Sequence, residues 1–178
     1  MEKDVGTILQ LFPLGENGLI VCWCTPEHGI LRTAARNART PGSELSGRLD
    51  LFHECELVYR PATRGGNLHS LSSAELLNPR LALRGSLVSL RLCSYMARLL
   101  LATVEQESGD AAWHTLITGA FDYVASTSPR KAILRHFEKR LATLHGIYNA
   151  EFTAAHCLQQ HFHHLPTGRA ELMSALPE

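Results

Sequence analysis

Arginine is the residue type whose pattern in this sequence points most directly to binding chemistry. Four arginines surround one expected strand and the loop after it: Arg32, Arg36, Arg39 and Arg48. The first two are an even number of residues apart, so a strand would place both on one face. Proteins bind single-stranded nucleic acid with a cationic groove for the phosphates and aromatic rings for the bases. The rings available in this part of the chain are Phe12, Trp23, Phe52 and Tyr59.

These same side chains also have a purely structural interpretation. The rings would then fill a hydrophobic core, and the arginines would pair with Glu27, Glu44 or Glu54. Residues 1–78 hold seven basic and nine acidic side chains, which gives a net charge of −2. A DNA site in this region therefore has to be a local patch, and both interpretations stay open.

A second group of arginines lies in a stretch without acidic residues, between Glu75 and Glu105. Arg84, Arg91 and Arg98 repeat every seven residues, which predicts a cationic ridge along one exposed helix face. Such a ridge suits phosphate or an acidic peptide tail, because arginine binds carboxylates in a bidentate manner. The alternative is a solvated helix face that the following acidic residues neutralise.

The third candidate for chemistry is the tail, where five of the ten histidines fall at positions 145–164. On one helix, Cys157, His161 and His164 would share a face and could ligate zinc, given a fourth ligand from elsewhere. A small metal-dependent enzyme would follow from that arrangement, whereas exposed histidines on a short helix are the simpler interpretation. The sequence lacks nucleophile-elbow, HExxH and phosphate-loop motifs, so we predict no catalysis and no cofactor.

The charge balance and the hydrophobic content of the chain exclude several classes of protein. The 17 Lys and Arg residues balance 17 Asp and Glu residues, which excludes a protein that holds nucleic acid by overall charge. Hydrophobic residues make up 45% of the chain, which is typical of a globular protein. The sequence shows neither an apolar stretch long enough for a membrane span nor a secretory signal, and its five cysteines form no CxxC pair. We expect a cytoplasmic protein.

Strands are expected to position the first arginine group. Period-two and β-branched patterns predict five strands in residues 7–12, 19–24, 30–36, 49–59 and 67–71. Five short strands in succession favour a small closed barrel, because an open sheet of that size would leave two bare edges.

Helices are expected to carry the second group. Ser72 and Glu75 suggest a capping box where the period changes to 3.6. Apolar stripes predict helices over residues 88–102, 113–124 with Asp110 as N-cap, 133–144 and 150–164. The fold class is therefore α+β, with a barrel domain in residues 1–78 and an all-α domain in residues 79–178.

Several segments together resemble the RecO family of bacterial recombination-mediator proteins. In order along the chain they are PLGEN (13–17), TPEHG (25–29), ARNARTPGS (35–43), LHSLSSAELL (68–77) and FEKRLATLHG (137–146). The resemblance implies that the barrel is an OB-fold and that the chain takes part in DNA repair without being an enzyme.

The resemblance also implies partners. It suggests binding and annealing of single-stranded DNA and loading of recombinase onto strands coated by single-stranded-DNA-binding protein. The implied protein partners are RecR and the acidic, hydrophobic C-terminal tail of that coating protein. A different class remains open, namely a protein-interaction module that has lost DNA binding and docks an acidic tail through its helical domain.

Overall fold

The computed structural model describes residues 1–63 and 65–178 of the chain. These residues form two compact units. One unit contains Met1–Pro79 and Val104–His114, and the other contains Arg80–Thr103 and Thr115–Glu178. The chain thus leaves the first unit, returns to it for eleven residues, and leaves it again.

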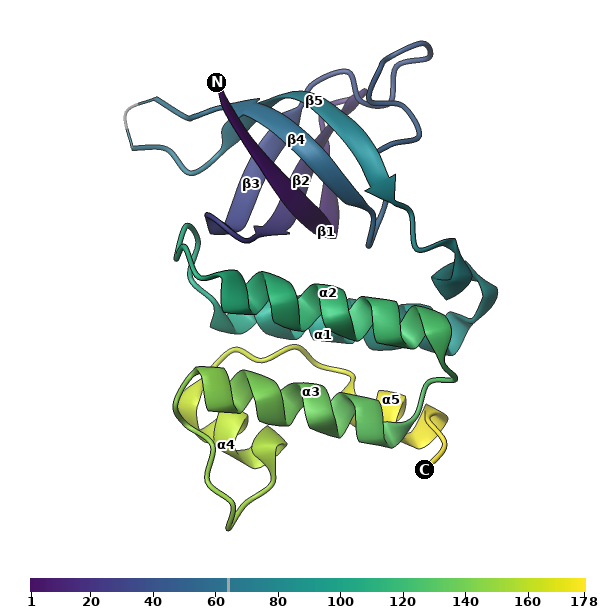
Figure 1. Ribbon diagram of the computed structural model, residues 1–178, viewed down its shortest axis with the longest axis vertical. Helices are drawn as coiled ribbons and strands as arrows, with labels where there is room; N and C mark the ends of the chain where they lie inside the picture. The colour runs from purple at the N-terminus through teal and green to yellow at the C-terminus, as the bar shows by residue number, and fades with distance from the viewer. Residues whose placement is uncertain (64) are drawn as a thin grey trace. The chain divides into compact units, whose positions relative to one another are not determined.

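The first unit is a closed five-stranded barrel, as the sequence predicts (Figure 1). The strands neighbour one another in the order β1-β2-β3-β5-β4, and β4 pairs back onto β1. All pairs are antiparallel except the short β3–β5 contact, which is parallel. The strands are β1 (Glu2–Leu14), β2 (Gly18–Thr25), β3 (Gly29–Ala35), β4 (Glu54–Arg60) and β5 (His69–Asn78).

Three of the four candidate stacking rings are buried, and Trp23 and Tyr59 belong to the hydrophobic core of the barrel. Trp23, Phe52 and Tyr59 are at most 1% exposed, so for these three the core interpretation is correct. The Trp23 indole N–H donates a hydrogen bond to Thr33 Oγ1 at 2.9 Å, which satisfies its polar atom inside the barrel. Phe12 is 38% exposed and is therefore the only one of the four rings that can meet a ligand directly.

The fourth strand begins later than predicted. The expected strand at residues 49–59 is extended only from Glu54, because Phe52 adopts a left-handed backbone conformation with φ of 68°. That conformation cannot continue a strand. Two backbone hydrogen bonds, Phe52 N to Ile8 O at 2.9 Å and Ile8 N to His53 O at 2.8 Å, hold the bend against β1.

The fifth strand is longer than predicted, and the capping box at Ser72 and Glu75 is wrong. Both residues lie within β5, which pairs with β4 from Glu54↔Asn78 to Arg60↔Ser70. The serine and the acid are exposed, and each directly follows a buried residue, Leu71 or Ala74. Tertiary pairing to β4 thus overrides a local helix signal.

Residues 104–114 cover the part of β3 that β5 does not reach. Gln106 forms a parallel bridge with Ile30, and the Glu107 N–H donates to the Ile30 carbonyl at 3.0 Å. Gly29 permits this approach, since its φ is +65° and an added Cβ would lie 2.9 Å from Ser108 Oγ. The segment therefore closes an otherwise bare strand edge.

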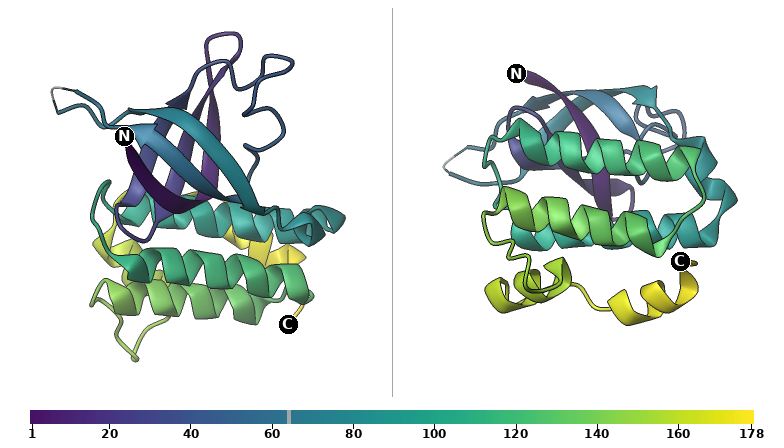
Figure 2. Two further views of the ribbon diagram at one scale, coloured as in Figure 1. Left: turned by 45° about the horizontal axis from the view of Figure 1, so that its top comes forward. Right: turned by 60° about the horizontal axis from the view of Figure 1, so that its bottom comes forward.

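The second unit is helical (Figure 2). Helix α1 packs against η1, α3 and α5, and α4 packs against α3. None of the helices in the described residues is long and apolar enough to cross a membrane. The elements are η1 (Leu81–Gly85), α1 (Leu87–Thr103), α2 (Ala111–Ser126), α3 (Lys131–Leu144), α4 (Ala154–His161) and α5 (Arg169–Ala175).

The predicted N-cap of α2 is correct, whereas the bounds of the predicted C-terminal helix are wrong. Asp110 caps α2 as predicted, accepting a hydrogen bond from the Ala112 N–H at 2.8 Å. The expected helix at residues 150–164 is shorter, because Thr153 caps α4 and the helix ends at His161. A further helix, α5, follows Gly168, which has φ of 93°.

A buried ion pair joins α3 to α5. Arg169 Nε and Nη2 donate to the two carboxylate oxygens of Glu138 at 2.6 and 2.8 Å. The Glu138 side chain is only 2% exposed. This bidentate contact supplies the counter-charge that a buried carboxylate requires.

Candidate nucleic-acid and peptide-binding surfaces

The first arginine group lies partly on β3 and partly in the loop that follows it. Arg36 comes one residue after the end of β3, so the prediction that it shares a strand face with Arg32 is wrong. The reason is Asn37, whose φ of 59° turns the chain. Asparagine tolerates this left-handed conformation better than most residues. The turn leaves the Arg36 side chain exposed.

Two of the four arginines use part of the guanidinium to hold the loop in place. Arg39 Nη2 donates to the Glu16 carbonyl at 3.2 Å, and the Arg39 backbone N–H donates to the Asn17 carbonyl at 2.9 Å. Arg48 Nη1 donates to the Ala74 carbonyl at 2.9 Å. Both side chains remain exposed to solvent on their other atoms.

Arg32 differs from the other three because it lies beside a buried thiol. It pairs with Cys22 across the β2–β3 ladder and is half-buried. Burial raises the pKa of Cys22, and the charge of Arg32 partly opposes this rise. None of the four arginines forms an ion pair with any described residue, so the predicted pairing with Glu27, Glu44 or Glu54 does not occur there.

The helical unit carries a groove between α1 and the start of α5. Its volume is about 600 Å³. Leucines and a tyrosine provide apolar surface, while two arginines stand along α1. The lining residues are Leu87, Leu90, Arg91, Ser94, Tyr95, Arg98, Gly168, Glu171 and Leu172.

Arg91 and Arg98 give the groove its positive charge; they are seven residues apart and both are exposed on α1. One acidic residue, Glu171 of α5, also lines the groove. The Arg98 guanidinium lies 5.9 Å from the centre of the Tyr95 ring, and its Nε donates to the Ser94 carbonyl at 3.4 Å. Burial first, and the nearby Glu138 carboxylate second, raise the pKa of Tyr95 to about 12, so this ring stays neutral. Helix α1 contains no acidic residue.

Arg84 does not belong to the ridge that the seven-residue spacing predicts. It lies in the short helix η1, and Ser86 separates η1 from α1 with an extended backbone. The residue is exposed, but it does not line the groove. The spacing is correct for Arg91 and Arg98 because only these two share a continuous helix.

The zinc ligands suggested in the tail do not come together. Cys157 is buried, and its thiol donates to the Asn149 carbonyl at 3.7 Å. His161 is the last residue of α4, and His164 lies beyond that helix, so the shared face does not exist. Within residues 1–63 and 65–178, the one cluster with metal-ligand spacing is elsewhere, at Asp4, Glu27 and His28. The antiparallel β1–β2 pairing, with Thr7 opposite Cys24, brings the start of β1 beside the β2–β3 turn. Sequence reasoning missed the cluster because the first strand was predicted to begin only at residue 7, whereas β1 begins at Glu2.

The strand order and the single parallel contact define a class: the first unit is an OB-fold barrel, and a helical unit follows it. The family described as "Recombination protein O N terminal" matches residues 1–80. The chain belongs to the RecO family.

Individual relatives extend this match beyond the barrel. DNA repair protein RecO of Cyanothece sp. (strain PCC 7425 / ATCC 29141) is 38% identical over 99 residues, which cover 56% of this chain and 33% of the relative. DNA repair protein RecO of Aliivibrio fischeri (strain MJ11) is 30% identical over 151 residues, covering 84% of this chain and 60% of the relative. The corresponding protein of Dehalococcoides mccartyi is 25% identical, with 89% and 61% covered. The chain thus spans about a third to three fifths of the length of these relatives.

Proposed function

We propose that this protein acts in DNA repair and recombination as a non-enzymatic mediator that binds single-stranded DNA and partner proteins. Family membership and the OB-fold barrel support the DNA-repair role. Barrels of this type bind single strands with a basic surface and stacking rings. The surface proposed for this contact carries exposed Arg36 and Arg39, with the half-buried Arg32 and with Arg48 at the far end of the same loop.

The groove on α1 is the single observation that carries the partner-binding part of the proposal. A partner tail with several carboxylates and a terminal aromatic ring matches its chemistry, because Arg91 and Arg98 can meet the carboxylates and the leucines can cover the ring. We assign the tail of single-stranded-DNA-binding protein to this groove. Arg84, which is exposed on the preceding helix η1, lies outside this groove, and we propose it as an outer contact of the same tail.

RecR is the second protein partner that we propose, and its contact surface is left unassigned. The activities that follow from these contacts are strand annealing and recombinase loading. Neither requires a covalent step, so the proposal includes no catalytic residue.

Three observations on residues 1–78 favour a second function, in which the chain binds proteins but not DNA. Three of the four rings that could stack on bases are buried, and two of the four arginines donate to backbone carbonyls. Residues 1–78 also carry a net charge of −2. A protein-interaction module that docks an acidic tail through α1 would have these properties.

Fluorescence anisotropy distinguishes the two functions. The full chain is titrated into a labelled single strand at several salt concentrations and, separately, into a labelled acidic peptide that ends in phenylalanine. A mediator binds both probes, and its DNA affinity falls steeply with salt because phosphate contacts release counterions. Peptide binding without DNA binding would establish the interaction module, and binding of neither would refute both functions.

A further inference from the structure

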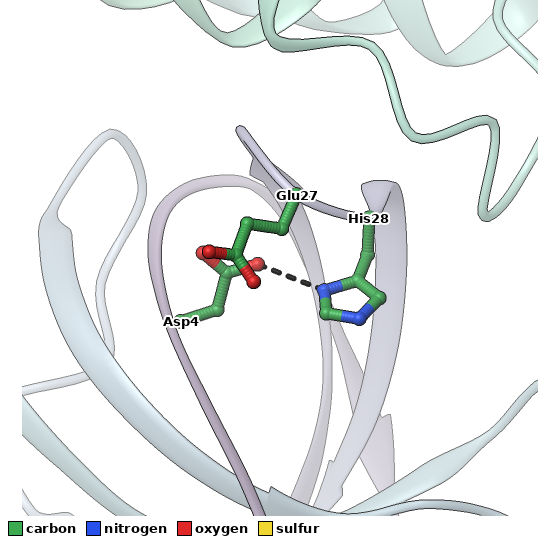
Figure 3. A group of neighbouring side chains, drawn as sticks. All are labelled: Asp4, Glu27 and His28. Atoms are coloured by element: carbon green, nitrogen blue, oxygen red, sulfur yellow. Dashed lines mark hydrogen bonds and ion pairs between the residues drawn. The ribbon is translucent and has the colours of Figure 1, made fainter.

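Three side chains with metal-ligand chemistry meet at one end of the barrel (Figure 3). Asp4 extends from β1, while Glu27 and His28 come from the turn between β2 and β3. One ligand atom from each residue lies within 4.8 Å of the other two. His28 Nδ1 is 3.0 Å from Asp4 Oδ2, and the Asp4 side chain is only 3% exposed.

Negative charge dominates this cluster. Glu2 is a third carboxylate beside it, with Oε2 3.7 Å from His28 Nε2 and 2.7 Å from the Tyr59 hydroxyl that donates to it. Three carboxylates therefore surround one imidazole. Lys3, the nearest cation in sequence, pairs with Glu56 at 2.8 Å and does not reach the cluster among the contacts of the described residues.

The carboxylates of Glu2 and Asp4 both lie close to the His28 ring, at 3.7 and 3.0 Å, so their like charges are held close together. A bound cation would relieve this repulsion.

We propose that Asp4, Glu27 and His28 bind a divalent transition-metal ion, with zinc as the best match. Imidazole favours zinc over magnesium or calcium, and carboxylates complete such sites. Two ligand atoms on one zinc ion lie about 3.0–3.4 Å apart when each bond is about 2.0–2.1 Å. The His28–Asp4 separation of 3.0 Å already falls at this spacing, so the ion replaces the proton that these two groups share.

The protein positions Asp4 and leaves Glu27 free to adjust. Asp4 Oδ1 accepts a hydrogen bond from the Val5 N–H at 2.8 Å, which fixes the orientation of the carboxylate as outer partners do in metal sites. Glu27 is exposed and forms no hydrogen bond or ion pair with any described residue. A change of rotamer therefore brings its oxygen to the ion at little cost. Water completes the coordination.

Binding would link the first strand of the barrel to the β2–β3 turn. Asp4 and His28 are 24 residues apart in sequence, so the ion closes a long loop of chain. The barrel should therefore become more stable when zinc is added, in proportion to the occupancy of the site.

The test is calorimetric titration of the full chain, stripped with chelator, with zinc chloride. We expect one ion per chain, and a Glu27→Gln variant should bind at least about tenfold more weakly. Because the Glu27 side chain is exposed and forms no hydrogen bond or ion pair with a described residue, this variant should unfold at the wild-type temperature in chelator. Glu44→Gln is the matched control, since it removes the same charge from an exposed position in the same unit, and it should bind like wild type.

A second pair of variants distinguishes this site from the tail histidines. His28→Gln should lose zinc binding and the thermal shift that zinc produces, whereas a His161→Ala and His164→Ala double variant should keep both. Absence of zinc binding in the wild type would overturn the proposal. Binding that survives Glu27→Gln and His28→Gln, or that disappears in the tail variant, would overturn it equally.

Discussion

The two arginine surfaces differ in what lies next to the guanidinium groups. In the loop after β3, Arg39 and Arg48 each donate to a backbone carbonyl, and neither lines the groove on α1. On α1, Arg91 and Arg98 stand over leucines and a tyrosine in a groove of about 600 Å³. The same residue type thus stands in two different surroundings. The residues around the arginines therefore determine which ligand a surface suits: the phosphate backbone of a nucleic acid, or a peptide tail that combines carboxylates with an aromatic ring.

This difference has an energetic side. An arginine on an open loop stays surrounded by water and dissolved ions, which strongly screen its attraction to phosphate. Its contribution to the free energy of DNA binding therefore depends on the salt concentration. An arginine at the edge of an apolar groove is partly desolvated when a peptide covers it, so its contact with a carboxylate is stronger. The predictions below test this contrast, beginning with the largest expected effect.

Removing the support of the groove should have the largest effect. Arg169→Met leaves the buried Glu138 carboxylate without its counter-charge and should destabilise the protein by about 3 kcal/mol. Urea unfolding measures the change. Arg130→Met is the control, because Arg130 is exposed and its loss should change stability by less than about 0.5 kcal/mol. Equal effects of the two changes would show that the ion pair does not support the helices.

Reversing the charge of the groove should have the next largest effect. Arg91→Glu with Arg98→Glu should weaken binding of an acidic tail peptide by about 1–3 kcal/mol, while leaving single-strand affinity nearly unchanged. Anisotropy with both probes measures this selectivity. Arg140→Glu, an exposed arginine of α3 outside the groove, is the matched control. If DNA affinity fell and peptide affinity did not, α1 would be the nucleic-acid surface.

Removing the charges of the loop arginines should have a smaller effect, mainly on how DNA affinity depends on salt concentration. Arg36→Ala with Arg39→Ala should reduce the slope of log affinity for single strands against log salt by about 1–2, because two phosphate contacts are lost. Arg60→Ala provides an exposed control on the same barrel. An unchanged slope would mean that these arginines serve the loop alone.

Acidification should have the smallest effect. Burial, and then the charge of His161, lower the pKa of His145 in the folded protein. The unfolded chain therefore binds a proton more readily, and the stability from neutral His145 is complete above the unfolded pKa of about 6.5 and declines as the pH falls through the folded pKa. A His145→Gln variant should lose less stability than wild type between pH 7.5 and pH 5, as measured by urea midpoints. The opposite order would show that His145 is stabilised in its charged form.

The sequence predicts the parts of this molecule that depend on local patterns. The barrel follows from five strand patterns in succession, and α1 follows from an apolar stripe whose members Leu92, Tyr95 and Leu99 are all buried. Local patterns failed at β5, where pairing with β4 extends the strand through a sequence that resembles a helix start. They failed again at Phe52, since nothing in the sequence announces a left-handed phenylalanine.

The candidate sites show the same division. Arg91 and Arg98 were found because their spacing matches the helix period, whereas the groove beside them depends on α5, which the sequence did not predict. The cluster at Asp4, Glu27 and His28 joins the start of β1 to the turn after β2, which the antiparallel register of these strands brings side by side. Such a cluster becomes visible only when the extent of β1 and its register with β2 are known.

Residues 104–114, which return to the barrel unit, determine which fragments of the chain can fold and when the barrel is completed during synthesis. The family match ends at residue 80, yet the compact barrel unit includes eleven later residues that hold Ile30 and His69, the latter through Glu107 at 3.1 Å. A fragment cut at Pro79 would therefore leave half of β3 with an open edge and invite aggregation. During synthesis, the ribosome must likewise release α1 before the barrel receives its last piece, so folding of the first unit is completed only after part of the second has emerged.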